Sequence, residues 1–555
     1  MFLSRSQRLP RSNQFYLKLN RLLFDDATKI LSSDTVASIP SDKNFVDYVW
    51  KDHKQFENKT AFTCGVSGRS LTYGQAYAAI DRLSANLPAE FGLQSEDNIA
   101  LLLPNIPEYA IAFFAAASTG IVSSLINPLY TSSELWKLLA HSKAKVIITI
   151  PPLLDTVKEA MAELPGGGLP VILVGGDGSQ KDTVDFKTLV AKSTRAVRRL
   201  DKASPQANIA LPFSSGTTGV PKGVVISHYN LVAQAETMLH AIPDYKTEPR
   251  STVAVIPFFH IYGLSMFMGF SLRRRMQVVS LPKFDPSTFL HALKTYKPSH
   301  LFLVPPLVEH MSRSPQITPD VMENLKFVST GAAPITGQIV EEFLQKSEHI
   351  QPFFMNGYGL TETAGGIIVT SETVKYGEYG MPVGKLCANC EAKIVNETGE
   401  ALPIGEAGEL WLRSPTVMKG YLENEEATKE IITDDGWLRT GDQARFDSSE
   451  NVYIVDRLKD IIKVKGFQVS PTEIEDVLIK MPGLADVAVI GVPVEDGEGP
   501  KAFVVRTAGS KITVEDVHAF LATKVAKFKK LSGGVQFVDL IPRSAAGKIL
   551  KKDLE

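Results

Sequence analysis

Short apolar runs alternate with longer helical patterns through most of the chain. An apolar run over 98–103 is followed by a helical pattern over 107–117, and a run over 145–150 is followed by a helical pattern over 153–164. Apolar strands that alternate with helices are typical of a parallel sheet whose two faces are both covered. The pattern therefore predicts an α/β fold for the large domain, over 45–455.

The pattern changes after Gly380. Short apolar runs over 393–396, 408–413 and 451–455 are separated by Gly, Pro and acidic turns, which is typical of short strands. We therefore expect a β-rich subdomain over 380–455, within the large domain.

A charged segment over 456–460 precedes the last part of the chain. Strand-like runs over 486–492 and 502–505 and a helical pattern over 514–525 follow it. About a hundred residues are enough for a separate small domain. The pattern predicts an α+β domain over 461–555, joined to the large domain through a hinge at the charged segment.

Composition narrows the class of protein. Of the 555 residues, 44% are hydrophobic and 22% are charged, which is typical of a globular enzyme. The net charge of −2 gives no positive field for a nucleic-acid backbone, so nucleic acid is excluded as a main partner. The apolar stretch over 110–129 is interrupted by polar residues, so a buried helix and a strand are expected there instead of a membrane span. Peripheral membrane contact and the oligomeric state stay open.

Cysteine use favours a reducing compartment. Cys387 and Cys390 form a single C-x-x-C without the second pair that a zinc site needs, so two incidental thiols near a turn are expected. The N-terminal extension, 1–44, begins with a basic segment that carries no acid before Asp25. A mitochondrial presequence and a loose basic extension both fit, so mitochondrial and cytoplasmic locations stay open. The C-terminus lacks the peroxisomal Ser-Lys-Leu signal.

The richest motif is Phe-Ser-Ser-Gly-Thr-Thr-Gly-Val-Pro-Lys-Gly, over 213–223. Its glycines, hydroxyls and lysine make a flexible loop lined with hydrogen-bond donors, which suits a polyphosphate. The loop lacks the Gly-Lys-Ser/Thr ending of a P-loop. A polar hairpin without a function is the alternative that composition alone leaves open.

This loop resembles the phosphate loop of the adenylate-forming superfamily, which includes acyl-CoA synthetases, 4-coumarate-CoA ligases, luciferases and peptide-synthetase adenylation domains. The resemblance runs from about residue 45 to residue 555, with further motifs in the family's order. It implies stacked sheets with flanking helices in the large domain, a mobile C-terminal domain, and the use of ATP, Mg²⁺ and coenzyme A. In the loop it assigns ATP contacts to Ser214, Ser215, Gly216, Thr217, Thr218, Gly219 and Lys222, with Thr218 as a second magnesium contact.

The segment 356–362, Asn-Gly-Tyr-Gly-Leu-Thr-Glu, resembles the family's adenine and magnesium motif. A tyrosine ring can stack on a purine, the Thr361 hydroxyl can contact the α-phosphate, and the Glu362 carboxylate can hold Mg²⁺. Gly331 and Ala332 resemble the segment beside the adenine, where small residues let a ligand approach the backbone. The motif assigns further ATP contacts to Asn356, Gly357, Tyr358 and Gly359.

The segment 437–442 resembles the ribose-binding motif, in which Asp442 can accept hydrogen bonds from both ribose hydroxyls. Arg457 is its expected cationic partner. A basic run over 459–468 resembles the hinge and the face that forms the thioester. The resemblance assigns Lys459 to the hinge, Lys463 to the nucleotide, Lys465 and Gly466 to the CoA tunnel, and Lys283 to the CoA phosphates.

The segment 541–550 resembles the C-terminal loop that carries the family's catalytic lysine, which is Lys548 here. An ammonium between the attacking carboxylate and the α-phosphate would stabilise charge that develops in the transition state.

The acyl pocket is expected around His260, which stands between aromatic residues in 258–262. The resemblance adds Tyr262, Met266, Ser329 and Gly365 as contacts to the acid. Plant 4-coumarate-CoA ligases have a lysine at the position of Ser329, so the hydroxycinnamate pocket is altered here. Methionines near the motif favour an apolar, adaptable cavity and a medium- or long-chain fatty acid. A hydroxycinnamate is the alternative.

The sequence thus predicts an ATP-dependent acid:CoA ligase, which forms an acyl-adenylate and then a thioester. A carrier-loading adenylation module would need a carrier domain, for which the sequence leaves no room after the lysine loop. A non-catalytic acyl or nucleotide sensor would be expected to have lost Lys548, Glu362 or Asp442, and all are present.

Overall fold

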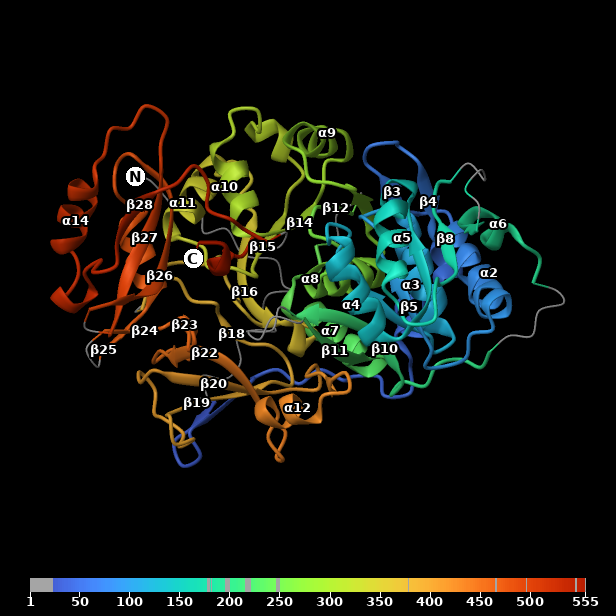
Figure 1. The fold of residues 1–555 in the computed structure, drawn as a ribbon, viewed down its shortest axis with the longest axis horizontal. Helices are drawn as coiled ribbons and strands as arrows, with labels where there is room; N and C mark the ends of the chain where they lie inside the picture. Colours follow the sequence, from blue (N-terminus) through green and yellow to red (C-terminus); the bar gives the residue numbers. More distant parts are fainter. Residues whose placement is uncertain are drawn as a thin grey trace, which may run out of the picture.

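The computed structural model describes residues 23–554 apart from 177–179, 181, 195–199, 215–220, 246–249, 378, 465–466, 496 and 545–546. In this part of the chain the strands form three large sheets and two small ones. Figure 1 shows the C-terminal unit, in orange and red, at one end of the molecule beside the helices α10 (Pro305–Arg313) and α11 (Gly337–Lys346). The predicted mixed α/β fold is confirmed.

One large sheet is built around parallel strands. Its members are β5 (Asn98–Leu101), β6 (Val122–Leu125), β7 (Ala144–Thr149), β8 (Val171–Leu173), β9 (Thr183–Asp185), β10 (Asn208–Ser214), β11 (Lys222–Ser227) and β21 (Gly420–Tyr421). Their order is β21-β11-β10-β6-β5-β7-β8-β9, and β11 is antiparallel to both of its neighbours. The predicted strands near 98–103 and 145–150 are thus confirmed as β5 and β7.

A second large sheet carries most of the predicted nucleotide motif. Its members are β3 (Thr60–Cys64), β4 (Ser70–Thr72), β12 (Ser251–Ala254), β13 (Gln277–Ser280), β14 (His300–Leu303), β15 (Phe327–Thr330), β16 (Phe353–Leu360), β17 (Gly365–Val369) and β18 (Lys385–Leu386). Their order is β18-β17-β16-β15-β14-β12-β13-β3-β4, and β14, β15 and β16 are parallel. The carboxyl ends of these parallel strands therefore meet at one edge, where ligands bind in many α/β proteins.

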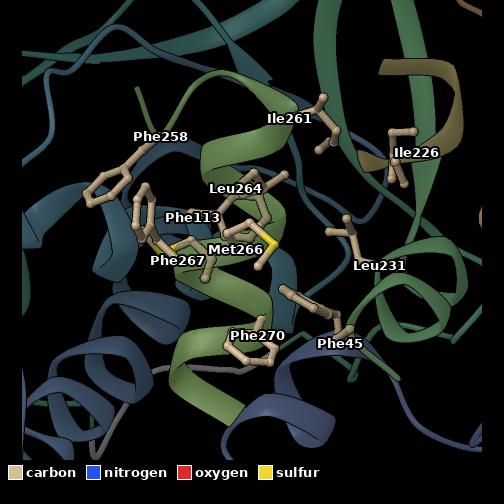
Figure 2. Close-up of a cluster of buried hydrophobic side chains, with 14 of the residues drawn as sticks. Phe45, Phe113, Ile226, Leu231, Phe258, Ile261, Leu264, Met266, Phe267 and Phe270 are labelled. Carbon is tan, nitrogen blue, oxygen red and sulfur yellow. The ribbon is translucent and has the colours of Figure 1, made fainter. Parts of the chain in front are cut away.

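The main hydrophobic core joins the two sheets through buried helices. These are α1 (Phe45–Val49), α3 (Pro107–Ser118), α7 (His228–Ala241) and the π-helix η4 (Leu264–Ser271). Figure 2 shows η4 among side chains that include Phe45, Phe113 and Leu231. Every residue from Tyr109 to Ala117 of α3 is at most 4% exposed, as expected of a helix that is apolar on all sides.

Other helices cover the outer faces of these sheets. The helices α4 (Ser132–Ser142) and α5 (Leu154–Ala162) share a core with β5, β7 and β8. The helices α9 (Pro286–Tyr296), α10 and α11 share another core with β12 to β15. The longest helix, among those described, is α2 (Tyr73–Phe91), which begins at a capping box of Thr72 and Gln75 and contacts α3 and α6 (Phe186–Ala191).

The predicted β-rich subdomain corresponds to a third large sheet. Its members are β1 (Phe24–Asp25), β2 (Ile30–Ser32), β19 (Glu391–Val395), β20 (Gly408–Arg413), β22 (Leu438–Phe446) and β23 (Val452–Arg457), in the order β1-β2-β19-β20-β22-β23. The helix α12 (Glu425–Ile431) lies beside β21 and β22. Residues 24–32 were predicted to belong to an N-terminal extension, but they form the edge hairpin of this sheet because β2 pairs with β19.

The C-terminal unit has a core of its own. It contains β24 (Ile462–Val464), β25 (Phe467–Val469), α13 (Pro471–Leu478), β26 (Leu484–Val494), β27 (Gly497–Arg506), α14 (Val514–Ala522) and β28 (Gly534–Phe537). The predicted strands and helix of the α+β unit are therefore present. Hydrogen bonds cross the predicted hinge, since the Ser470 hydroxyl and the Thr472 amide donate to Asp456 Oδ2 at 2.6 and 3.0 Å.

The apolar helices and the cysteines bear on the functions that the sequence excludes. The helices of the described residues include none with the length and apolar composition that crossing a membrane requires. Cys387 and Cys390 are buried free thiols, and burial raises the pKa of both. Cys390 N–H donates to the Cys387 carbonyl across a turn at 3.2 Å.

Candidate active site

The phosphate-loop motif connects two antiparallel strands. Ser214 ends β10 and Lys222 begins β11, and the two residues are paired in the sheet. The predicted ATP contacts Ser215, Gly216, Thr217, Thr218 and Gly219 lie outside the described residues. The described ends of the motif therefore fix where the loop leaves and rejoins the sheet.

The adenine motif lies on β16, where small residues are required by close backbone contacts. A Cβ atom on Gly359 would lie 2.1 Å from the carbonyl oxygen of Gly365 on β17. A Cβ atom on Gly331 would lie 3.0 Å from the carbonyl oxygen of Gly357. The neighbouring Ala332 has a φ of 70°, which is uncommon for a residue with a side chain. The edge of the sheet where the nucleotide is predicted to bind is thus built from closely packed backbone.

Asn356 has a structural partner in the same region. Its buried side-chain amide donates to the carbonyl of Pro382 at 2.9 Å. This bond ties β16 to the segment that leads toward β18. The Asn356 backbone is engaged as well, since its amide donates to Thr370 Oγ1 at 3.1 Å and its carbonyl accepts from the Thr370 amide at 2.9 Å.

Tyr358, Asp442 and Arg457 come together from three strands. The Tyr358 hydroxyl donates to Asp442 Oδ2 at 2.6 Å, and Arg457 Nε lies 3.3 Å from Asp442 Oδ1. The antiparallel register of β22 and β23 pairs Asp442 directly with Arg457. Burial raises the pKa of the Asp442 carboxyl, and the Arg457 charge opposes that shift. The result is a buried carboxylate held by a phenol and a guanidinium.

Lys548 is brought to this cluster by the C-terminal loop. The loop is anchored by Arg543, whose Nη2 lies 2.8 and 3.0 Å from the two carboxylate oxygens of Asp486. Gly547 has a φ of 79°, and a Cβ atom there would lie 3.2 Å from Pro306 at the start of α10. The loop therefore packs directly against the large domain.

Burial and two nearby cations lower the pKa of Lys548. Burial is the largest cause, and the nearby cations Arg457 and Lys459 act in the same direction, so the pKa falls to about 8. The carboxylates of Asp442 and Asp460 oppose the shift. Lys548 is thus close enough to the Asp442 cluster for electrostatic interaction, although it lies more than a hundred residues further along the chain.

Glu362 has a partner that sequence reasoning missed. The Tyr421 hydroxyl donates to Glu362 Oε1 at 2.9 Å, and the Met418 amide donates to the Glu362 carbonyl at 2.8 Å. The ammonium of Lys222 lies 4.8 Å from the centre of the Tyr421 ring. Tyr421 therefore contacts both the predicted magnesium ligand and the lysine of the phosphate-loop motif.

The donor set at Glu362 suits Mg²⁺ that arrives with a nucleotide. In the described part of the chain, Glu362 Oε2 has no hydrogen-bond partner, and no group of three or more His, Cys, Asp or Glu side chains forms a cluster suited to a metal. Mg²⁺ is usually held by one or two carboxylates together with substrate phosphates and water. A single carboxylate beside a phosphate loop fits that mode of binding. Thr361 precedes Glu362 in η6 (Thr361–Thr363).

The residues predicted for the acyl pocket surround the end of β15 and the start of α8 (Ile261–Gly263). His260 Nδ1 accepts from the Tyr262 amide at 3.2 Å, and burial lowers the pKa of His260 to about 4, so the imidazole is neutral. The Tyr262 hydroxyl lies 3.2 Å from Ser329 Oγ. Met266 on η4 is 3% exposed and belongs to the core drawn in Figure 2.

Gly365 lies against two polar side chains that were not predicted. A Cβ atom on Gly365 would lie 2.8 Å from Ser265 Oγ and 3.1 Å from Gln234 Nε2. Gln234 is 1% exposed and donates to the Gly366 carbonyl at 2.9 Å. Neither residue belongs to a motif, so only the packing of α7 and η4 against β17 reveals them.

The remaining predicted site residues lie apart from the Asp442 cluster or outside the described residues. Lys463 lies on β24, where its backbone amide donates to Glu498 Oε2 at 2.9 Å. Lys283 is exposed beyond the end of β13. Neither side chain is joined to the Asp442 cluster by a hydrogen bond or an ion pair in the described residues. Lys465 and Gly466 lie outside the described residues.

The fold and these motifs define an enzyme with a large α/β domain and a small C-terminal unit whose lysine loop packs against it. The AMP-binding enzyme model matches residues 49–422, and the model of the AMP-binding enzyme C-terminal domain matches residues 473–548. The chain belongs to the AMP-binding enzyme family. The prediction of an AMP-forming acid:CoA ligase is confirmed at this level.

Proteins of similar sequence support the assignment of this chain to the family. The chain is 38% identical to a probable CoA ligase, CCL5, of Humulus lupulus over 89% of this chain and 90% of that protein. It is 35% identical to 4-coumarate–CoA ligase 1 of Petroselinum crispum over 93% of this chain and 94% of that protein.

Solved structures are similar over the same extent. ATP-bound MatB from Rhodopseudomonas palustris is 28% identical, with a TM-score of 0.81, 92% of this chain covered and 98% of that chain. The apo form of MatB covers the same shares and gives a TM-score of 0.73. The arrangement of this chain is therefore more similar to the ATP-bound form.

Proposed function

We propose that this chain joins a carboxylic acid to coenzyme A through an acyl-adenylate formed from MgATP. The observation that carries the proposal is the approach of Lys548 to Asp442, Arg457 and Tyr358. Burial of the Lys548 ammonium close to the cations Arg457 and Lys459 costs free energy, which a bound anionic ligand would offset. Nucleotide binding between the two units explains why the charges are gathered there.

The proposed roles follow the chemistry of each group. Asp442 accepts hydrogen bonds from the ribose hydroxyls, and the ring of Tyr358 lies along the adenine. Thr361 contacts the α-phosphate and Glu362 holds Mg²⁺, which neutralises phosphate charge when bound. The Lys548 ammonium stabilises the charge that develops as the carboxylate attacks the α-phosphorus and pyrophosphate leaves.

The second half-reaction is proposed to need a rotation of the C-terminal unit about Lys459. The thiol of CoA attacks the carbonyl of the adenylate, AMP leaves, and the face around Lys465 and Gly466 replaces the Lys548 loop. The hydrogen bonds from Ser470 and Thr472 to Asp456 hold the present orientation, so rotation would have to exchange them for other partners. Lys463 and Lys283 are proposed to contact the nucleotide and CoA phosphates.

The proposed acid is a medium- or long-chain fatty acid. The hydroxyl of Ser329 is within hydrogen-bond distance of Tyr262, and the cluster around Met266 is apolar, which suits an aliphatic chain. A hydroxycinnamate is the second candidate, because curated relatives at 34–35% identity carry the name 4-coumarate–CoA ligase. Turnover of decanoate above 4-coumarate by the purified protein supports the first candidate, and the reverse order replaces it with the second.

The pKa of Lys548 predicts a pH dependence for the first half-reaction. The kcat/KM for ATP, measured by pyrophosphate exchange, should fall as the pH rises through about 8, because the protonated ammonium is lost there. The pH profile of kcat/KM reports the pKa values of groups in the free enzyme. The pKa of about 8 belongs to Lys548 in the protein without a ligand. Lys548→Arg keeps its charge and should lose this alkaline limb. If the fall in kcat/KM at alkaline pH persists unchanged in Lys548→Arg, the fall arises from the titration of another group.

A further inference from the structure

We propose that Tyr421 is a positioning residue for the magnesium and phosphate side of the site. The inference rests on the proposed function, because it concerns the nucleotide that Glu362 and Lys222 would bind. Neither a motif nor a charge points to Tyr421 in the sequence. Its contacts with Glu362 and Lys222 identify it in the structure.

The first contact fixes the carboxylate of Glu362. The Tyr421 hydroxyl donates to Oε1 at 2.9 Å, while the Met418 amide holds the backbone carbonyl of Glu362 at 2.8 Å. The bond from Met418 fixes the backbone of Glu362, and the bond from Tyr421 restricts the rotation of a side chain that would otherwise sample several rotamers. The carboxylate is therefore held with Oε1 engaged and Oε2 free of hydrogen bonds from the described residues.

The second contact holds Lys222. Its ammonium lies 4.8 Å from the centre of the Tyr421 ring, within the range of a cation–π interaction. Tyr421 on β21 is adjacent to β11, and its Cα partner there is Val224. One aromatic side chain thus links the cation of the phosphate-loop motif to the anion proposed to bind Mg²⁺.

Tyr421 is itself held in place by the elements around it. Its amide donates to Thr428 Oγ1 of α12 at 2.9 Å. Gly420 has a φ of 150°, and a Cβ atom there would lie 2.8 Å from Thr428 Cγ2. The close approach of α12 to β21 explains the glycine and fixes the backbone from which the ring projects.

The test separates metal-dependent from metal-independent binding of ATP. Affinity for ATP is measured by titration calorimetry without the acid, once with Mg²⁺ and once with EDTA. In Tyr421→Phe the gain in affinity that Mg²⁺ provides should shrink by about threefold to tenfold, because one hydrogen bond to a carboxylate is lost while the ring remains. Affinity in EDTA should not change. Tyr421→Leu should weaken ATP binding in EDTA as well, because Lys222 loses the ring.

Two variants make the result specific. In a Glu362→Gln background, Tyr421→Phe should have no further effect on the gain from Mg²⁺, since the two residues act as a unit. Tyr376→Phe, which removes a half-exposed hydroxyl elsewhere, serves as the control. An unchanged gain in Tyr421→Phe would overturn the inference. Wild-type protein that binds ATP with no gain from Mg²⁺ would instead reject the proposed role of Glu362.

Discussion

Lys548→Ala is expected to slow acyl-adenylate formation by about 10²- to 10³-fold, the usual effect of removing one preorganised electrostatic donor. In the structure this ammonium lies within the fields of Asp442, Arg457 and Asp460, where burial has already lowered its pKa to about 8. Removing it leaves the attacking carboxylate and the α-phosphate without a cation between them. Pyrophosphate exchange with saturating acid measures the effect.

The same variant should retain the second half-reaction. Thioester formation from CoA and a supplied acyl-adenylate should proceed at close to the wild-type rate, because the Lys548 loop is proposed to have left the site by then. Lys530→Ala, an exposed lysine of the same C-terminal unit, is the control for loss of charge. Equal loss of both half-reactions in Lys548→Ala would contradict the assigned role.

Asp442→Ala is expected to lower kcat/KM for ATP by about 10- to 100-fold, because hydrogen bonds to a charged group contribute roughly 1.5–3 kcal/mol. The wild-type carboxylate accepts from Tyr358 and lies 3.3 Å from Arg457 Nε, so its oxygens are already oriented. Steady-state kinetics of pyrophosphate release with varied ATP provides the measurement.

A nucleotide analogue makes this prediction specific to the ribose. Wild-type protein should prefer ATP to 3′-deoxy-ATP, and Asp442→Ala should lose most of that preference. Tyr358→Phe removes one partner of Asp442 but keeps the carboxylate, so it should keep the discrimination. An Asp442→Ala enzyme that still discriminates as the wild type does would show that the ribose hydroxyls are recognised by other groups.

Much of the fold could be predicted from the periodicity of the chain. The strand-helix pair β5 and α3 and the pair β7 and α5 were expected within a few residues of their bounds, because buried parallel strands and apolar helices leave strong patterns. The hairpin of residues 24–32 was missed. Its strands are two and three residues long, and only pairing with β19 identifies them.

The candidate site was predictable only in part. Asp442 and Arg457 were predicted as partners and Tyr358 as a residue of another motif, and the register of β22 and β23 places Asp442 opposite Arg457. Tyr421, Ser265 and Gln234 could not be found in this way. They are ordinary residues in β21, η4 and α7, and their importance arises from neighbours that are distant in sequence.

The central claim is that activation proceeds through an acyl-adenylate. The most direct measurement supplies purified protein with MgATP, CoA and an acid labelled with ¹⁸O in its carboxylate, and follows the label by mass spectrometry. We predict pyrophosphate, an acyl-CoA thioester and AMP that carries one ¹⁸O atom, since the carboxylate oxygen is transferred to the α-phosphorus. Formation of ADP and phosphate, or of thioester with unlabelled AMP, would contradict the account.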